Sequence, residues 1–346
     1  MAAIGGFQAL MIRSVFVHTN TDPNSWCGVA GIEQTGPDDL WVTYYEGGPK
    51  EPHPDNRVAL VRSRDRGATW SEPVVVADPP GTIAAWDPGL WRGPDGSLWL
   101  FYNTADHDFS KVDCARIGAR IDTKTGAVGE AKPLVPGVDC FGLNRPTLLP
   151  NGDWAMPMVV FENQGKPDKV WYYRRQQGIG VALSSDNGQS WRMSEVVTSP
   201  DKFINENMLY VCADGRLRML ARTRTGRIWQ TWSSDNGRTW SQPESTDIPN
   251  PNSRFFVGKL KNGDVVLFNN PSDVPDIGHH ARTSIVLNVS HDDGKTWSPD
   301  HVIAAGQWIA YPDMVEDPKG GLHVIYDTGR QNILYCFLSP EDIGGR

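Results

Sequence analysis

Four segments of the 346-residue chain repeat one eight-residue pattern, Ser-x-Asp-x-Gly-x-(Ser/Thr)-Trp. They span residues 63–70, 184–191, 233–240 and 290–297. The Asp can accept hydrogen bonds from nearby backbone amides, the Gly can adopt positive φ, and the Trp can wedge between neighbouring sheets. The pattern therefore predicts a β-hairpin turn that recurs through the fold. Its acidic loop could also suggest calcium, but it lacks the further carboxylates of an EF-hand, so we expect no metal.

A second repeat, out of phase with the first, predicts the number of sheets. It is a polar turn followed by an alternating apolar strand, and it starts at Asp38, Asp95, Asn151, Asp214, Asn262 and Lys319. Two degenerate copies of the first pattern, residues 121–126 and 339–344, bring that series to six as well. Helical periodicity is almost absent, and turn residues recur about every ten residues. We predict an all-β, six-bladed β-propeller of four-stranded antiparallel blades, a single domain over residues 1–346 closed by a strand at about 12–18.

Bulk composition excludes several classes of function. The net charge is −8 without a basic run, which disfavours nucleic acid and membrane surfaces as partners. Five cysteines without paired spacing indicate buried residues rather than disulfides or a metal site. No motif indicates a cofactor, so we expect none. The N-terminus lacks a positive leader region, which predicts a cytoplasmic protein, or a secreted or periplasmic one if a leader peptide has been removed.

The starts of the six inner strands should meet at the centre of such a propeller. These segments are Trp26-Cys27-Gly28, Trp86-Asp87-Pro88, Asn144-Arg145-Pro146, Asn205-Glu206-Asn207, Ser253-Arg254-Phe255 and Tyr311-Pro312-Asp313. Two arginines, three carboxylates and a tyrosine are unusual for packing and typical of a polar ligand pocket. A solvated rim is the alternative interpretation.

These patterns resemble the sialidase (neuraminidase) superfamily, whose Asp boxes, also called BNR repeats, mark the same fold. Residues 205–222 resemble the segment that carries the family's catalytic glutamate and a carboxylate-binding arginine, which implies those roles for Glu206 and Arg222. The run from Asn270 to Tyr311 resembles the segment leading from another such arginine to the nucleophilic tyrosine. The resemblance thus implies substrate binding by Arg282 and catalysis by Tyr311.

The chain also departs from that family. Where sialidases have an Arg-Ile-Pro motif, it has Trp26-Cys27-Gly28, so the first arginine of the triad is missing and an outlying, sialidase-like member is implied. Arg145 and Arg254 are candidates to replace that charge, and Asp87 and Asp313 are further candidates for substrate binding. In place of the general acid, the loop Gly-Gly-Pro-Lys-Glu-Pro-His-Pro-Asp-Asn provides three candidates, which are Glu51, His53 and Asp55.

These residue types suit an exo-glycosidase of sialidase type that acts on a terminal, carboxylate-bearing sugar of a glycan. Arginines would bind the sugar carboxylate, and Tyr311, deprotonated by Glu206, would attack the anomeric carbon. A uronate-specific polysaccharide lyase is an alternative, with His53, His107 or the His279-His280 pair as base. A second alternative is a non-catalytic, glycan-binding propeller.

Overall fold

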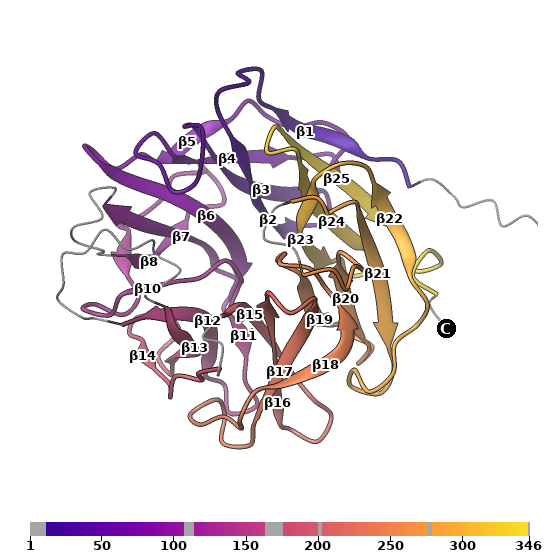
Figure 1. The fold of residues 1–346 in the computed structure, drawn as a ribbon. Coiled ribbons are helices and arrows are strands. Elements are labelled where there is room, and N and C mark those ends of the chain that lie inside the picture. Colours follow the sequence, from indigo (N-terminus) through magenta and orange to yellow (C-terminus); the bar gives the residue numbers. More distant parts are fainter. Residues whose placement is uncertain (1–11, 107–113, 163–175, 200–202, 276–278, 345–346) are drawn as a thin grey trace, which may run out of the picture.

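Six antiparallel sheets surround a central axis and form a six-bladed β-propeller (Figure 1). The computed structural model describes residues 12–106, 114–162, 176–199, 203–275 and 279–344. All regular structure in these ranges is strand, which confirms the predicted all-β fold. Nothing in the same ranges forms a helix of the length and apolar character that a bilayer span requires.

Each blade runs from an inner strand at the axis to an outer strand at the rim. The first blade comprises β2 (Cys27–Gly36), β3 (Asp39–Glu46), β4 (Arg57–Ser63) and β5 (Val74–Ala77). The second comprises β6 (Ile83–Arg92), β7 (Leu98–Asp106), β8 (Ala115–Ile121) and β9 (Lys132–Pro133). The third comprises β10 (Cys140–Phe141), β11 (Thr147–Leu148), β12 (Trp154–Phe161), β13 (Gln176–Ser184) and β14 (Arg192–Met193). Here β10 and β11 both pair with β12, so they are two pieces of one interrupted inner strand.

The last three blades follow the same order. The fourth comprises β15 (Ile204–Val211), β16 (Leu217–Thr223), β17 (Arg227–Ser233) and β18 (Glu244–Pro249). The fifth comprises β19 (Phe256–Lys259), β20 (Val265–Asn269), β21 (Ser284–Ser290) and β22 (His301–Ala305). The sixth comprises β23 (Ile309–Glu316), β24 (Leu322–Thr328), β25 (Asn332–Leu338) and, at its outer edge, β1 (Val15–Thr19).

The Asp boxes form the expected turns between the third and fourth strands of their blades. In the box after β21, Asp292 accepts hydrogen bonds from the backbone N and the hydroxyl of Thr296, both at 2.8 Å. Gly294 has φ of 78° and donates its N–H to the Ser290 hydroxyl at 2.7 Å. The other three boxes repeat these contacts. The boxes therefore stabilise the hairpins at the rim of the molecule.

Ring closure brings the tip of the last hairpin against the first inner strand. Strand β1 pairs with β25, and Asn20 N–H donates to the carbonyl of Gln331 at 2.8 Å. Cys27 N–H, at the start of β2, donates to the carbonyl of Arg330 at 2.9 Å. The turn between β24 and β25 thus lies beside the start of the first inner strand, although about 300 residues separate the two segments in sequence.

Four inner strands carry the same β-bulge at the same place. In β2, β6, β15 and β23, two residues oppose one residue of the neighbouring strand, and the first bulged residue has positive φ. These residues are Val29, Asp87, Glu206 and Tyr311, with φ of 50°, 49°, 36° and 57°. A bulge re-aims the side chain of the extra residue, and non-glycine residues adopt positive φ only where the surrounding structure requires it.

Candidate active site

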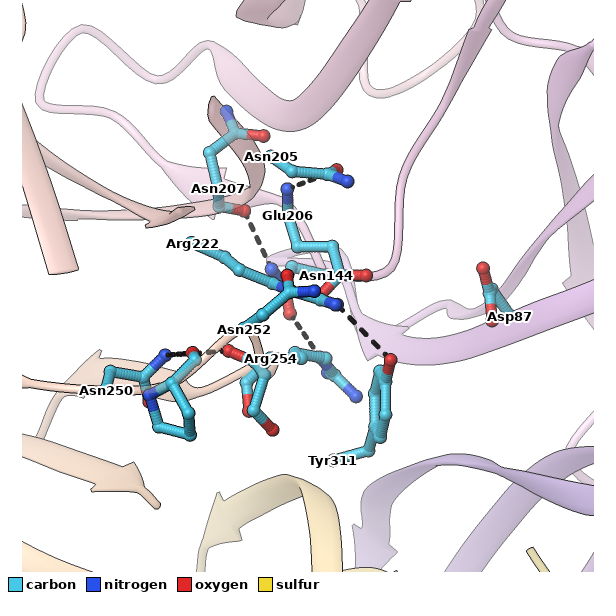
Figure 2. A network of polar contacts seen from close by, with 12 residues as sticks. Asp87, Asn144, Asn205, Glu206, Asn207, Arg222, Asn250, Asn252, Arg254 and Tyr311 are labelled. Carbon is cyan, nitrogen blue, oxygen red and sulfur yellow. Dashed lines mark hydrogen bonds and ion pairs between the residues drawn. The ribbon is translucent and has the colours of Figure 1, made fainter. Parts of the chain in front are cut away.

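Three of the four bulge residues are polar and lie together at the propeller axis. Asp87, Glu206 and Tyr311 are each about one-twentieth exposed, and Figure 2 shows them on different sides of one polar network. Their backbone conformation is strained, and the strain recurs where titratable groups converge. The fold therefore places two carboxyl groups and a phenol at the axis, where we expected the starts of the inner strands to meet.

Arg222 joins Glu206 to Tyr311. It extends from β16, where it pairs in register with Asn205 of β15. Its Nη1 forms an ion pair with Glu206 Oε2 and donates a hydrogen bond to Tyr311 Oη at 3.3 Å (Figure 2). Its Nε donates to Asn252 Oδ1 at 2.8 Å. The phenol and the carboxylate thus share one guanidinium nitrogen.

Arg282 also lies beside Tyr311, and its positive charge has few hydrogen-bond partners. Its guanidinium carbon is 5.3 Å from the centre of the Tyr311 ring, and Nη2 donates to the carbonyl of Asn252 at 2.6 Å. Within the described ranges, Nε and Nη1 have no hydrogen-bond partner, although the side chain is almost fully buried. Burial lowers the pKa of Arg282, and the neighbouring positive charges of Arg222 and Arg330 lower it further. A buried guanidinium with unused donors is a suitable site for an anion.

Arg330 is a third guanidinium at the same tyrosine, and our sequence analysis missed it. Its carbon is 4.3 Å from the centre of the Tyr311 ring. Nη1 lies 3.0 Å from Asp327 Oδ2, and Nη2 lies 2.6 Å from Glu51 Oε1. Burial opposes its charge, but Glu51, Tyr45 and Asp327 outweigh burial and raise the pKa of Arg330 well above its usual range. The sequence signal would have been the Asp-Thr-Gly-Arg turn that follows the apolar strand β24.

Asp87 is a buried carboxyl group whose surroundings favour its protonated form. Burial raises its pKa well above the usual range, and the negative charges of Glu51 and Glu206 act in the same direction. Its Oδ2 accepts a hydrogen bond from Asn103 Nδ2 at 3.3 Å. Arg116, also missed from sequence, donates to the backbone carbonyl of Asp87 at 2.8 Å.

Arg254 belongs to the polar network beside these residues. Its Nε donates to Asn144 Oδ1 at 2.9 Å, and Asn144 Nδ2 donates to the carbonyl of Asn207 at 2.7 Å (Figure 2). Its Nη1 is buried without a hydrogen-bond partner in the described part of the chain. Arg254 and Asn144 therefore connect the third, fourth and fifth blades at the axis.

The structure does not bring Arg145 and Asp313 to Tyr311, where we had expected both to contribute to substrate binding. Arg145 Nη2 lies 2.7 Å from Asp313 Oδ2, and Nη1 lies 3.4 Å from Glu33 Oε2. Arg145 also donates to the carbonyl of Ile32 at 2.9 Å. These contacts link the third, sixth and first blades in a separate ion-pair cluster, because Arg145 follows an interruption of its inner strand rather than the bulge found in the other blades.

The three candidates for the general acid lie in different surroundings. Glu51 points into the site, where its carboxylate contacts Arg330. His53 Nδ1 and Asp55 Oδ2 lie 3.4 Å apart, and the Asp55 side chain is 73% exposed. Glu51 is thus the candidate for which the described residues show a contact with an arginine beside Tyr311.

The described histidines considered as lyase bases lie in different surroundings. His279 stacks on Trp308 with 4.3 Å between ring centres, and His280 is exposed. His107 lies outside the described residues. Among the described residues there is no group of three or more His, Cys, Asp or Glu side chains that could hold a metal ion. The thiol of Cys27 is buried, which raises its pKa to about 12 and makes it a poor nucleophile.

Comparisons with known proteins indicate the same family that the sequence patterns resemble. A family profile described as a BNR repeat-like domain matches residues 39–324. A sialidase of Micromonospora viridifaciens is 25% identical over 180 residues, which cover 49% of this chain and 26% of that protein. A sialidase of Bacteroides fragilis is 22% identical over 248 residues, which cover 60% of this chain and 44% of that protein. The chain thus spans less than half the length of these curated relatives.

A solved structure shares the fold over nearly the whole chain. The Hadza microbial sialidase Hz136 superposes with a TM-score of 0.79 at 17% sequence identity, covering 95% of this chain and 69% of that one. At this identity the likeness concerns the fold, and the chemistry must be argued from the residues of the site.

Proposed function

The chain belongs to the BNR repeat-like family within the sialidase superfamily, and on this premise we propose that it is a retaining exo-glycosidase. Its proposed substrate is a glycan that ends in a carboxylate-bearing sugar, of which N-acetylneuraminic acid is the first to test. The relatives named above are sialidases, which supports a glycan substrate.

One observation carries the proposal. Glu206 and the Tyr311 phenol both contact Nη1 of Arg222, in a buried site where Arg282 has two unused donors. A lectin pocket does not require a base beside a phenol, whereas nucleophilic catalysis by tyrosine does. The unused donors suit a planar carboxylate, which a guanidinium can bind through two hydrogen bonds.

The proposed first step forms a bond between Tyr311 Oη and the anomeric carbon. Glu206 accepts the phenolic proton, the glycosidic bond breaks, and a general acid protonates the leaving oxygen. A neutral phenol approaches the anomeric carbon of an anionic sugar without the repulsion that an attacking carboxylate would meet. In the second step water attacks the same carbon, the former acid accepts a proton from this water, and Glu206 returns the proton to Tyr311 as the covalent bond breaks.

We assign the general acid to Glu51. It is the candidate whose carboxyl group contacts the arginines of the site, while His53 and Asp55 contact each other at the surface of the loop. Its loop joins β3 to β4 and can adjust its conformation to the leaving group of the substrate. Asp87, with its raised pKa, is positioned to donate a hydrogen bond to a sugar hydroxyl.

Fluorogenic α-glycosides test the proposal. We expect the protein to release 4-methylumbelliferone from the glycoside of N-acetylneuraminic acid or of another acidic sugar. Tyr311→Phe and Glu206→Gln should each lower kcat by about a hundredfold or more, because each removes a group that transfers a proton or forms the covalent bond. Tyr326→Phe is the matched control, since it removes a phenol of the same blade that contacts Ser14 instead of the site.

A covalent trap identifies the nucleophile. A sugar analogue with fluorine at C3 and fluoride as the leaving group should add its mass to the peptide that contains Tyr311, and not in Tyr311→Phe. Release of an ultraviolet-absorbing unsaturated product from a uronate glycan, without hydrolysis of any acidic glycoside, would instead establish a lyase. Glycan binding that is equal in all variants, with no turnover, would establish a lectin.

A further inference from the structure

We propose that Arg330 binds the carboxylate of the acidic sugar together with Arg222 and Arg282, and that Glu51 occupies Arg330 until the substrate displaces it. This inference rests on the function proposed above. It assigns a substrate-binding role to a residue of the β24–β25 turn and a competing role to the loop between β3 and β4, which is far from that turn in sequence.

Gly28 provides the space that Arg330 occupies. A Cβ atom on Gly28 would lie 2.5 Å from Arg330 Nη1 and 2.9 Å from Asp327 Oδ2, closer than such atoms approach in proteins. Its φ lies outside the left-handed region, so the backbone does not require glycine here. The absence of a side chain at position 28 is therefore explained by the guanidinium that takes its place.

The turn that carries Arg330 is fixed to the first blade from both sides. The Arg330 carbonyl accepts the N–H of Cys27, and Gln331 Nε2 donates to the carbonyl of Ser25 at 2.8 Å. Arg330 itself has φ of 55°, a conformation that a non-glycine residue adopts at a cost. These contacts hold the guanidinium beside Tyr311 before any ligand binds, which lowers the entropic cost of binding.

The two carboxylate partners of Arg330 are not equivalent. Asp327 is fully buried, and its Oδ2 also accepts the N–H of Val29 at 2.9 Å, so it is a fixed anchor. Glu51 lies on the loop between β3 and β4, and its side chain is 19% exposed. An incoming carboxylate can therefore replace Glu51 without disturbing Asp327.

Arg330 also retains donor capacity for this exchange. Its Nε has no hydrogen-bond partner in the described part of the chain, and Nη2 would become available when Glu51 leaves. The exchange would thus release the Glu51 carboxyl group from Arg330 and leave it free to act on the leaving group in the proposed hydrolysis.

Removal of the guanidinium tests the role of Arg330. We would measure the affinity for N-acetylneuraminic acid and for its methyl ester by calorimetry, with thermal melting to monitor folding. Arg330→Ala should weaken binding of the acid by about tenfold to one hundredfold and affect the ester much less. Arg330→Lys should keep part of this affinity, because it retains a positive charge beside Asp327. Arg62→Ala is the control, since Arg62 pairs with Asp39 at the outer side of the first blade.

Three results would overturn this role: no binding of the acid by the wild-type protein, equal binding by Arg330→Ala, or a folded Arg330→Lys variant that binds no better than Arg330→Ala. The outcome is separable from that of the hydrolase proposal. If Tyr311→Phe still turns over substrate, the assigned nucleophile is wrong. The affinities of the Arg330 variants would still show whether Arg330 binds the carboxylate.

Removal of the competing charge tests the role of Glu51. Glu51→Gln keeps the size of the side chain, and we expect it to tighten binding of the acid several-fold while kcat falls. Asp55→Asn, an exposed change in the same loop, should alter neither quantity. Unchanged affinity for the acid in Glu51→Gln would show that Glu51 does not compete for Arg330.

Discussion

Replacing Gly28 with alanine should destabilise the protein by about 1.5–5.5 kcal/mol. The added Cβ would lie within 3.0 Å of both Arg330 Nη1 and Asp327 Oδ2. Overpacking in a buried site costs about 1–3 kcal/mol, and loss of the charged hydrogen bond between these two groups costs about 1.5–3 kcal/mol. Alanine restricts the unfolded chain more than glycine, which returns about 0.4–1 kcal/mol.

Urea unfolding followed by circular dichroism would measure this change. Gly89→Ala is a matched control, because Gly89 is also buried in a bulged inner strand, and its Cβ would meet only ordinary contacts of 3.5 and 3.6 Å. We expect this control to remain within about 1 kcal/mol of the wild type. If Gly28→Ala is as stable as Gly89→Ala and keeps its affinity for N-acetylneuraminic acid, the packing of Arg330 against Gly28 does not exist in solution and our reasoning is wrong.

Three further predictions concern ligand binding and the effect of pH on stability. Arg282→Met should raise the melting temperature of the free protein, because it removes an uncompensated buried charge, and should abolish stabilisation by N-acetylneuraminic acid; a lower melting temperature would contradict this. Asp292→Asn should lower the melting temperature at neutral pH. The hydrogen bonds of this box lower the pKa of Asp292 to about 2, so the stabilisation by this carboxylate is present above the unfolded pKa of about 3.9 and is lost as the pH falls toward 2. The melting temperature of Asp292→Asn should therefore depend less on pH in that range. Burial lowers the pKa of His323 to about 4, so as the pH falls the unfolded chain takes up a proton at this histidine before the folded protein does. The free energy of unfolding should therefore decrease by about 2 kcal/mol between pH 7 and pH 5. In urea unfolding, His323→Gln should lack this part of the pH dependence.

The scaffold could be predicted because each of its signals is local. Asp95 and Gly96 form their turn through a hydrogen bond to a residue two positions away and through a φ of 80° that favours glycine. The same holds for Ser290, Asp292 and Gly294 in the Asp box, whose contacts all lie within the box. Repetition of such units predicted six blades and a shared centre. The five cysteines, all within the described ranges, are buried and free as expected.

The site could be predicted only in part. Glu206 and Tyr311 were identifiable because each begins an inner strand, and the structure places both at one guanidinium. Arg145 also belongs to the start of an inner strand, but that strand is interrupted, and Arg145 forms ion pairs with Asp313 and Glu33. Position along a strand does not reveal whether a bulge turns the side chain toward the axis or whether a carboxylate of another blade neutralises it.

The sequence by itself determined the blades, their turns and the chemical types that reach the centre, because these depend on contacts between residues close in the chain. Only the tertiary structure decided which charges act together. Ring closure through β1 and β25 brings Arg330, which lies beside Tyr311 of its own blade, against Gly28 across some 300 residues of chain, a contact that leaves no periodic trace in the sequence. Burial gives these charges their effect. Unpaired guanidinium donors would be solvated at the surface, whereas at the buried axis they form a site for an anion.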